Sequence, residues 1–277
     1  MNRQNLTHYG LKWNPFATDL PVEGLLATPA VDAFCHRIEH HLVRQGGFAL
    51  IGGPPGIGKS VALRLLAERL ERIDRLSVAV LTHPSSSVAD FYHEISDRFA
   101  ITMAHNNRWN GIKGLRQRWL DHLDDTRMRP LLLVDEAQEL PNAVLTEMRL
   151  LSSTDFDSRT ILGVVLAGDN RLLAKLRTPE LHPIDSRIRQ RLLMTRPEDE
   201  DLLRLLDHLL EEAGNPALMT AGLKDTLVAH AGGNPRTLTV MADALLAAGA
   251  DQDREVLDEK LFLETWGEPT KTRRARR

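Results

Sequence analysis

The stretch Gly53-Pro54-Pro55-Gly56-Ile57-Gly58-Lys59-Ser60 decides the fold of this chain. It matches the phosphate-binding pattern G-x-x-x-x-G-K-[ST] at every position. The glycines let backbone N–H groups turn inward around phosphates, and the start of the next helix adds its positive end. Lys59 supplies a charge for the β- and γ-phosphates, and the Ser60 hydroxyl can hold Mg²⁺. We therefore predict an ATP site formed by these eight residues and Val61, with Mg²⁺ as its metal.

The surroundings of this stretch fit the same interpretation. A short apolar run at 48–52 precedes it, and a segment with helical spacing follows it directly. Further apolar runs occur at 76–82, 130–136, 160–169 and 191–195, with helical patterns between them. Strands that alternate with helices predict an α/β fold, a phosphate-loop core with a parallel five-stranded sheet.

The pattern changes to helices alone after Pro197. We expect helices at 199–213, 220–231 and 236–249 and near 253–265, separated by Gly- and Pro-rich turns. This predicts a small C-terminal all-helical lid domain. The expected domains are an N-terminal arm and helix at 1–45, the core at 46–196, the lid at 197–265 and a basic tail at 266–277.

Two acidic residues follow the apolar run at 130–134. Asp135 is expected at the carboxyl end of a strand, where it can hold Mg²⁺ through water. Glu136 can orient and deprotonate an attacking water, so we assign it as the catalytic base of an ATPase. The alternative is that both acids cap the following helix.

The run at 160–169 ends on polar residues that are expected near the γ-phosphate. Asp169 or Asn170 is therefore a candidate first sensor of the nucleotide. Asp169 would direct negative charge toward phosphate, so it would act through a water, or Asn170 would act instead. The alternative is that Asp169 caps the next helix.

Arginines in two segments are candidates for contact with the nucleotide. Arg187 is the first candidate and Arg191 the second for reaching a γ-phosphate bound by a neighbouring subunit. Arg236 opens a helix of the expected lid and is the candidate second sensor. The alternatives are a solvated basic edge for the first two and an ordinary exposed arginine for the third.

The bulk properties predict a soluble cytoplasmic protein. Cys35 is the single cysteine, which excludes an internal disulfide framework, and no apolar run approaches the roughly 20 residues of a membrane span. The N-terminus lacks the apolar stretch of a signal peptide. The net charge of −3 means that any contact with DNA must come from a local basic patch.

Two such patches are visible. One lies on the helix expected at 110–128, where Arg118 lies opposite the apolar stripe and Lys113 to one side of it. Arg116 lies close to the stripe, as a structural residue would. The other is the tail, with Arg273 and Arg274 among its cations. The candidate contacts with the phosphates of DNA are therefore Lys113, Arg118, Arg273 and Arg274.

In this order, the phosphate loop, the acidic pair, the polar strand end and the arginines resemble the AAA+ ATPases over about residues 10–250. Residues 9–16, 134–140 and 165–168 are similar to the ExeA family. One branch of that family contains secretion ATPases with a membrane helix and a cell-wall-binding domain. The other contains short ATPases that work beside a DDE transposase and are related to phage Mu B protein, TnsC and TniB.

The length, the basic tail and the absence of an apolar membrane segment favour the second branch. The resemblance then implies ATP-dependent assembly of copies into a ring or filament on double-stranded DNA, with little sequence preference. It also implies recruitment or activation of a DDE transposase at the target site. The alternative is a secretion or cell-envelope assembly ATPase that acts on a protein partner.

Overall fold

The computed structural model describes residues 3–81, 87–100, 108–155 and 158–266, with the backbone alone at 3–5 and 108–111. The chain forms two compact units, which are treated separately below. One is Ala27–Thr195, and the other combines Met1–Leu26 with Arg196–Arg277.

The unit Ala27–Thr195 is built on a five-stranded sheet in the order β2-β3-β6-β1-β7. All four pairings are parallel, which confirms the expected sheet. The order places β6 between β1, which leads into the phosphate loop, and β3, which leads into the acidic pair. The strands are β1 Gly47–Gly52, β2 Val78–Leu81, β3 Leu131–Val134, β6 Gly163–Gly168 and β7 Ile188–Leu193.

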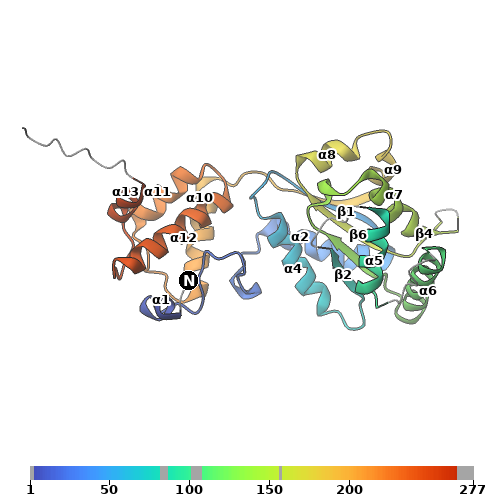
Figure 1. The fold of residues 1–277 in the computed structure, drawn as a ribbon, viewed down its shortest axis with the longest axis horizontal. Coiled ribbons are helices and arrows are strands. Elements are labelled where there is room, and N and C mark those ends of the chain that lie inside the picture. Colours follow the sequence, from blue (N-terminus) through green and yellow to red (C-terminus); the bar gives the residue numbers. More distant parts are fainter. Residues whose placement is uncertain (1–2, 82–86, 101–107, 156–157, 267–277) are drawn as a thin grey trace, which may run out of the picture. The chain divides into compact units, whose positions relative to one another are not determined.

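Helices cover both faces of this sheet (Figure 1). One face packs against α2 Pro29–Arg37, the π-helical turn η2 Ile38–Leu42 and α4 Lys59–Glu71. The other packs against α5 Val88–Arg98, α6 Arg108–Thr126, α7 Asn142–Leu151, α8 Asn170–Leu176 and α9 His182–Asp185. Shorter elements are α3 Val43–Gln45, the 3₁₀ turn η3 Ala137–Glu139 and the antiparallel pair β4 Ser153–Thr154 and β5 Arg159–Thr160.

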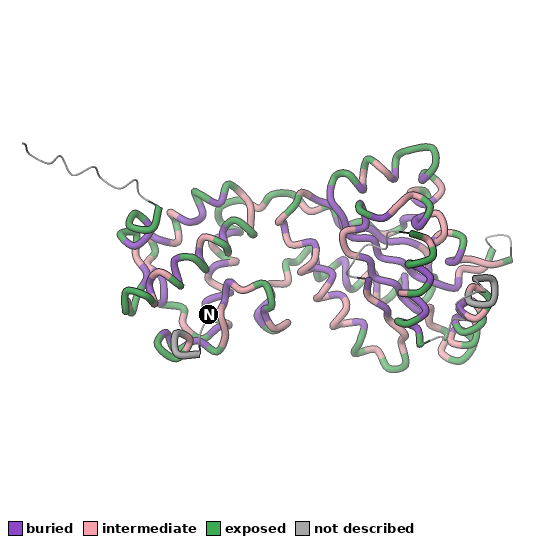
Figure 2. Tube along the Cα trace, in the orientation of Figure 1, coloured by how far each residue is buried: buried purple, intermediate pink, exposed green. Residues whose placement is uncertain are grey.

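Alternation along the strands explains why both faces are apolar. Phe48 and Leu50 of β1 enter one cluster of buried side chains, whereas Ala49 and Ile51 enter the other. The inner strands are buried throughout, as Figure 2 shows for the sheet. The continuous apolar runs of the sequence therefore mark strands with helices on both sides.

The strand β7 differs from the expectation. It spans Ile188–Leu193, whereas the apolar pattern predicted a strand at 191–195, so the strand begins three residues earlier than expected. In the sheet, β7 pairs with β1 alone. An edge strand alternates between buried and exposed residues, and here Ile188 and Leu192 are buried while the residues between them are polar. The apolar run that reveals an inner strand is therefore missing.

The second unit is helical, as expected for residues 197–265. Its helices are α10 Asp199–Ala213, α11 Ala221–Ala231, α12 Pro235–Asp251 and α13 Glu259–Trp266. The first three agree closely with the sequence pattern, and α13 begins six residues later than expected. The N-terminal segment adds α1 Arg3–His8 and the 3₁₀ turn η1 Val22–Gly24.

The first 45 residues do not form one element, in contrast to the expected arm and helix at 1–45. Residues 1–26 pack with the helical unit, and residues 27–45 pack on the sheet. The backbone N–H of Lys12 donates to the Ala213 carbonyl at 2.8 Å, and the Asn215 amide donates to the Tyr9 carbonyl at 2.8 Å. Phe16 is buried. The two hydrogen bonds join residues about 200 positions apart in the sequence, so the local sequence pattern does not reveal them.

Across the described part of the chain, every helix is too short or too polar to cross a bilayer.

Candidate nucleotide-binding site

The phosphate loop joins β1 to α4 and has the backbone that its glycines allow. Gly56 and Gly58 have φ values of 77° and 103°, in the left-handed region that other residues rarely occupy. Gly53 has a different reason to be glycine, because a Cβ there would lie 2.6 Å from the Met194 carbonyl oxygen. The loop therefore needs small residues both for its turns and for close approach to the segment after β7.

Lys59 is the first residue of α4, and its side chain turns into the loop. Only 6% of its surface is exposed. Its Nζ donates to the carbonyl oxygens of Gly53 at 3.1 Å and Pro54 at 2.9 Å. A buried ammonium group held among backbone dipoles at a helix start is a strong attractor for phosphate oxygens.

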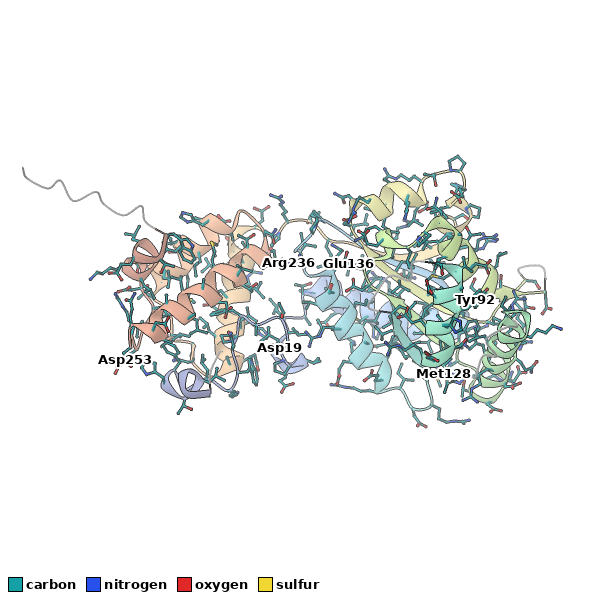
Figure 3. The ribbon with its side chains drawn as sticks, in the orientation of Figure 1. Asp19, Tyr92, Met128, Glu136, Arg236 and Asp253 are labelled. Carbon is teal, nitrogen blue, oxygen red and sulfur yellow. The ribbon has the colours of Figure 1, made fainter. Side chains whose placement is uncertain are left out.

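The acidic pair follows β3 directly. Asp135 accepts a hydrogen bond on Oδ1 from the backbone N–H of Glu136 at 2.9 Å. Glu136 has a φ of 48°, an uncommon conformation for a residue with a Cβ. Such strain is retained where the surroundings hold it, often at functional sites. Figure 3 labels Glu136 in this unit. The turn η3 begins directly after Glu136, so the two acids follow the end of a strand. The Glu136 side chain makes no capping hydrogen bond to η3, which does not support the helix-capping alternative for this residue.

Gln138 is a site residue that the sequence did not reveal. Its side chain is buried, with 5% exposed. Its Nε2 donates to a carboxylate oxygen of Glu136, and its Oε1 accepts from the backbone N–H of Asp169 at 3.1 Å. One amide therefore joins the end of β3 to the end of β6. Gly168 permits this contact, because a Cβ there would lie 2.6 Å from Oε1 of Gln138.

Lys175 supports the same residue from α8. Its Nζ donates to the backbone carbonyls of Gln138 at 2.9 Å and Leu140 at 2.7 Å. In the sequence, Gln138 belongs to the segment 134–140 that resembles the ExeA family, where it is a polar side chain two positions after Glu136 in a turn. Such a residue is usually exposed, so its burial between two strand ends could not be predicted from position alone.

Asp169 makes the helix-capping contact that we gave as the alternative to a sensor. Its carboxylate accepts from the backbone N–H of Arg171 at 2.8 Å and pairs with the Arg171 side chain at 2.9 Å. Arg171 in turn pairs with Glu139 at 2.6 Å. Asn170 is exposed at the start of α8. The sensor role of either residue stays a prediction.

Charge balance explains how an aspartate can stand at this strand end. Burial alone would raise the pKa of Asp169, but hydrogen bonds from Arg171, with the nearby charges of Arg171 and Lys59, lower it below its ordinary value. Asp169 is therefore a carboxylate whose charge Arg171 offsets. That pairing reduces the repulsion toward phosphate that made Asp169 an unusual sensor candidate.

Arg187 and Arg191 lie at the edge of the sheet beside α9. The Arg187 guanidinium donates to the Pro183 carbonyl, and Arg191 pairs with Asp185 at 3.0 Å. Both contacts are with α9. Their reach toward a neighbouring subunit's phosphate stays a prediction.

Arg236 belongs to the helical unit and lies at the start of α12 (Figure 3). The side chain of Asn234 caps that helix by accepting from the Arg236 backbone N–H at 3.0 Å. The Arg236 side chain is exposed. Its role as second sensor stays a prediction.

The candidate DNA contacts divide into described and undescribed residues. Lys113 and Arg118 are exposed on α6. Arg116 has the structural role expected of it, because its Nη2 donates to the Leu150 carbonyl at 2.6 Å. Arg273 and Arg274 lie outside the described residues.

These residues fit ATP and Mg²⁺. The loop offers glycine turns, a buried ammonium and a helix start, which match a polyphosphate. Ser60 in the first turn of α4 and Asp135 at the end of β3 provide the oxygen donors that Mg²⁺ prefers. The strand before the phosphate loop is β1 and the strand before Asp135 is β3, and β6 alone lies between them. The carboxyl ends of these three parallel strands meet at one edge of the sheet.

Sequence comparison relates the chain to known proteins. Residues 41–176 match the AAA domain family. General secretion pathway protein A of Aeromonas hydrophila is 29% identical over 260 residues, covering 92% of this chain and 47% of that protein. The ATP-dependent target DNA activator B of Escherichia phage Mu is 28% identical over 163 residues, covering 57% of this chain and 48% of that protein. The chain thus spans about half the length of the curated relatives it matches.

Structure comparison agrees on the fold. The ORC2 protein of Aeropyrum pernix, solved as ADPNP–ADP complexes, superimposes with a TM-score of 0.69 at 17% identity, covering 91% of this chain and 70% of that one. With the phosphate loop and the sheet order, the matches show that residues 41–176 form an AAA domain with the AAA+ P-loop fold, in a chain similar to general secretion pathway protein A and the phage target DNA activators.

Proposed function

We propose that this chain is a DNA-binding AAA+ ATPase that assembles with other copies on DNA when ATP is bound. In that state it recruits or activates a DDE transposase at the target site. The observation that carries the proposal is the relationship to a protein named as an ATP-dependent target DNA activator.

The surface of α6 supports the DNA part of this proposal. Lys113 and Arg118 are exposed there. Acidic residues on the same helix dilute the charge, but Asp124 pairs with Arg159 at 2.8 Å, and Asp121 accepts from Gln117 at 2.7 Å. A contact made through phosphates would tolerate many sequences.

A salt titration tests this function. Measured with a non-hydrolysable ATP analogue, duplex affinity should fall steeply as salt increases, with a log–log slope of about −0.9 for each phosphate neutralised. The double variant Lys113→Ala, Arg118→Ala should reduce the steepness by roughly 1.8, because two cations would no longer displace counterions. Fluorescence anisotropy of a labelled duplex measures both quantities.

Arg72→Ala is the matched control for this titration. Arg72 is also exposed but directly follows α4, on the opposite face of the sheet, and pairs with Glu68 at 3.1 Å. It should leave the slope unchanged. If the full chain with the analogue binds no duplex even at low salt, the DNA-binding function is wrong.

A specific observation favours a second function. The match to general secretion pathway protein A is longer than the match to the phage protein and covers 92% of this chain. On that basis the chain would be an assembly ATPase acting on a protein partner. ATP turnover unaffected by duplex DNA, together with absent DNA binding, would support this second function over the first.

The same residues account for turnover in either case. The Glu136 carboxylate takes a proton from water while the water oxygen attacks the γ-phosphorus. ADP leaves with the oxygen that had bridged the β- and γ-phosphorus atoms. Lys59 stabilises the charge on the phosphates, and Mg²⁺ held at Ser60 and Asp135 would offset the remainder. We infer that Gln138 acts as a positioning residue, because its amide holds the Glu136 carboxylate and is itself anchored on Asp169.

Replacing Gln138 by alanine should therefore lower kcat between about 10- and 100-fold with little change in KM for ATP, since a displaced base affects the chemical step and not phosphate binding. Steady-state ATPase assays measure this split. Combined with Glu136→Gln, the Gln138 change should cause almost no additional loss of rate, because its effect passes through Glu136.

Alanine at 138 also leaves the Asp169 N–H without its partner, so thermal unfolding must be recorded in parallel. Equal losses from Gln138→Ala in the unchanged and Glu136→Gln backgrounds would show that Gln138 merely supports the fold.

A further inference from the structure

Three metal-ligating side chains meet on the helix that precedes the sheet, away from the phosphate loop. His36 of α2 and Glu39 and His40 of η2 each offer one ligand atom, and these atoms lie within 4.8 Å of one another. Nδ1 of His36 lies 3.9 Å from Oε2 of Glu39, and the rings of His36 and His40 are 4.1 Å apart, edge to face. The proposed ATPase function uses none of them.

The helix itself causes this grouping. Residues three and four positions apart share one face of a helix, so positions 36, 39 and 40 project together. His36 and His40 are exposed, and Glu39 is half-buried. The two imidazoles are therefore accessible to an ion, and the carboxylate forms the inner side of the group.

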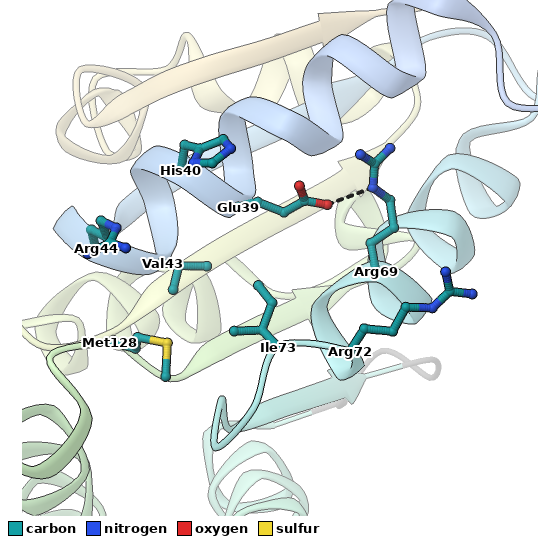
Figure 4. Close-up of a pocket in the computed structure, with 8 residues that line it drawn as sticks. All are labelled: Glu39, His40, Val43, Arg44, Arg69, Arg72, Ile73 and Met128. Carbon is teal, nitrogen blue, oxygen red and sulfur yellow. Dashed lines mark hydrogen bonds and ion pairs between the residues drawn. The ribbon is translucent and has the colours of Figure 1, made fainter.

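Contacts with α4 hold the carboxylate in place. Arg69 Nε donates to Oε1 of Glu39 at 2.6 Å (Figure 4). Arg69 Nη1 donates to Asp32 at 2.9 Å. The anchored Oε1 leaves Oε2 directed at His36.

The donor set selects the class of ion. Two imidazole nitrogens and one carboxylate oxygen suit Zn²⁺ and neighbouring transition metals, whereas Mg²⁺ prefers oxygen ligands and water. Ligands about 2.1 Å from a tetrahedral metal lie roughly 3.4 Å apart, so the ligand atoms, which now lie within 4.8 Å of one another, must draw together by up to about 1.4 Å. Small rotations of two exposed histidines can supply that movement.

Space for the remaining ligands is present beside the group. Glu39 and His40 also line a cavity of about 420 Å³ between this helix and α4, whose rim includes Arg44 and Arg72 (Figure 4). Water molecules can therefore complete the coordination, as they do at open zinc sites.

We propose that His36, Glu39 and His40 bind one transition-metal ion of the Zn²⁺ class. The ion links the α2–η2 helix to α4 through Glu39 and Arg69 and thereby stabilises the core unit. The site is separate from the Mg²⁺ that would accompany ATP, and it does not depend on the proposed DNA function.

Isothermal titration of the full chain with Zn²⁺, in the absence of nucleotide, tests the site. One site per chain is expected, and His36→Ala and His40→Ala should each weaken it by more than about 10-fold, because each removes a direct ligand. His41→Ala is the matched control, since His41 is an exposed neighbour outside the group. It should leave the affinity unchanged.

Thermal unfolding supplies an independent measurement. Zn²⁺ should raise the Tm of the unchanged chain and of His41→Ala, but not that of the double variant His36→Ala, His40→Ala, because binding to the native state alone stabilises it. Mg²⁺ at the same concentration should give no comparable shift. Zn²⁺ affinity that survives both His36→Ala and His40→Ala, or that His41→Ala weakens equally, would overturn the proposal.

Discussion

Replacing Lys59 by alanine should reduce nucleotide affinity so far that binding is no longer measurable at ordinary concentrations. Lys59 is buried at the start of α4 with its ammonium group inside the phosphate loop. Removing one partner of a desolvated charge pair costs about 2–5 kcal/mol, which corresponds to a loss of roughly 30-fold to several thousand-fold. Titration with a fluorescent ATP analogue measures this loss.

Two controls separate this effect from damage to the fold. The variant also removes a donor from the carbonyls of Gly53 and Pro54, so its circular dichroism and Tm must be compared with those of the unchanged chain. Lys260→Ala removes an exposed lysine of α13 and should bind nucleotide normally. A well-folded Lys59→Ala chain with near-normal affinity would show that the loop does not hold the phosphates as predicted.

Replacing Glu136 by glutamine should stop turnover while ATP binding persists. The amide keeps the size of the side chain and can still accept from Gln138, but it cannot take a proton from water. A positioned general base contributes about 10²- to 10⁴-fold to the rate, and we expect a loss in that range. Because ATP then remains bound, any ATP-dependent oligomer should accumulate, as size-exclusion chromatography with ATP would show.

Glu139→Gln is the matched control for this variant. Glu139 lies three residues further on, is largely exposed and pairs with Arg171 at 2.6 Å. Its amide variant should hydrolyse ATP at a rate close to that of the unchanged chain. Normal turnover by Glu136→Gln would remove the assignment of Glu136 as the base, whatever the state of assembly.

The strands show how far the sequence pattern reaches. Inner strands such as β3 and β6 were predictable because helices cover both their faces and every residue must be apolar. The edge strand β7 was predicted three residues too late, because one row of its side chains faces solvent. Its pairing with β1 depends on a neighbour more than a hundred residues away, which no local window contains.

The site divides in a similar way. The phosphate loop and the Asp135–Glu136 pair are contiguous motifs whose chemistry requires those residue types at that spacing, so they could be read directly. Gln138 and Arg171 act through contacts with Glu136 and Asp169, which come from different strand ends. The ends of β3 and β6 lie close together because these strands are neighbours in the sheet, and the residue pattern alone does not predict that strand order.

By itself the sequence determined the α/β core, because local spacing and side-chain chemistry suffice for it, and it predicted the phosphate-binding chemistry of residues 53–60 and of the acidic pair Asp135–Glu136. Only the tertiary structure decided that residues 1–26 pack with the helical unit, that Asp169 caps α8 and pairs with Arg171, and that Gln138 joins two strand ends. For residues 1–26 and for Gln138 the physical reason is that the contacts join segments distant in the chain, and their free energy depends on burial and geometry that exist only after folding. The Asp169 contacts are local, but the sequence allowed both a cap and a sensor, and only the folded geometry shows that the cap forms.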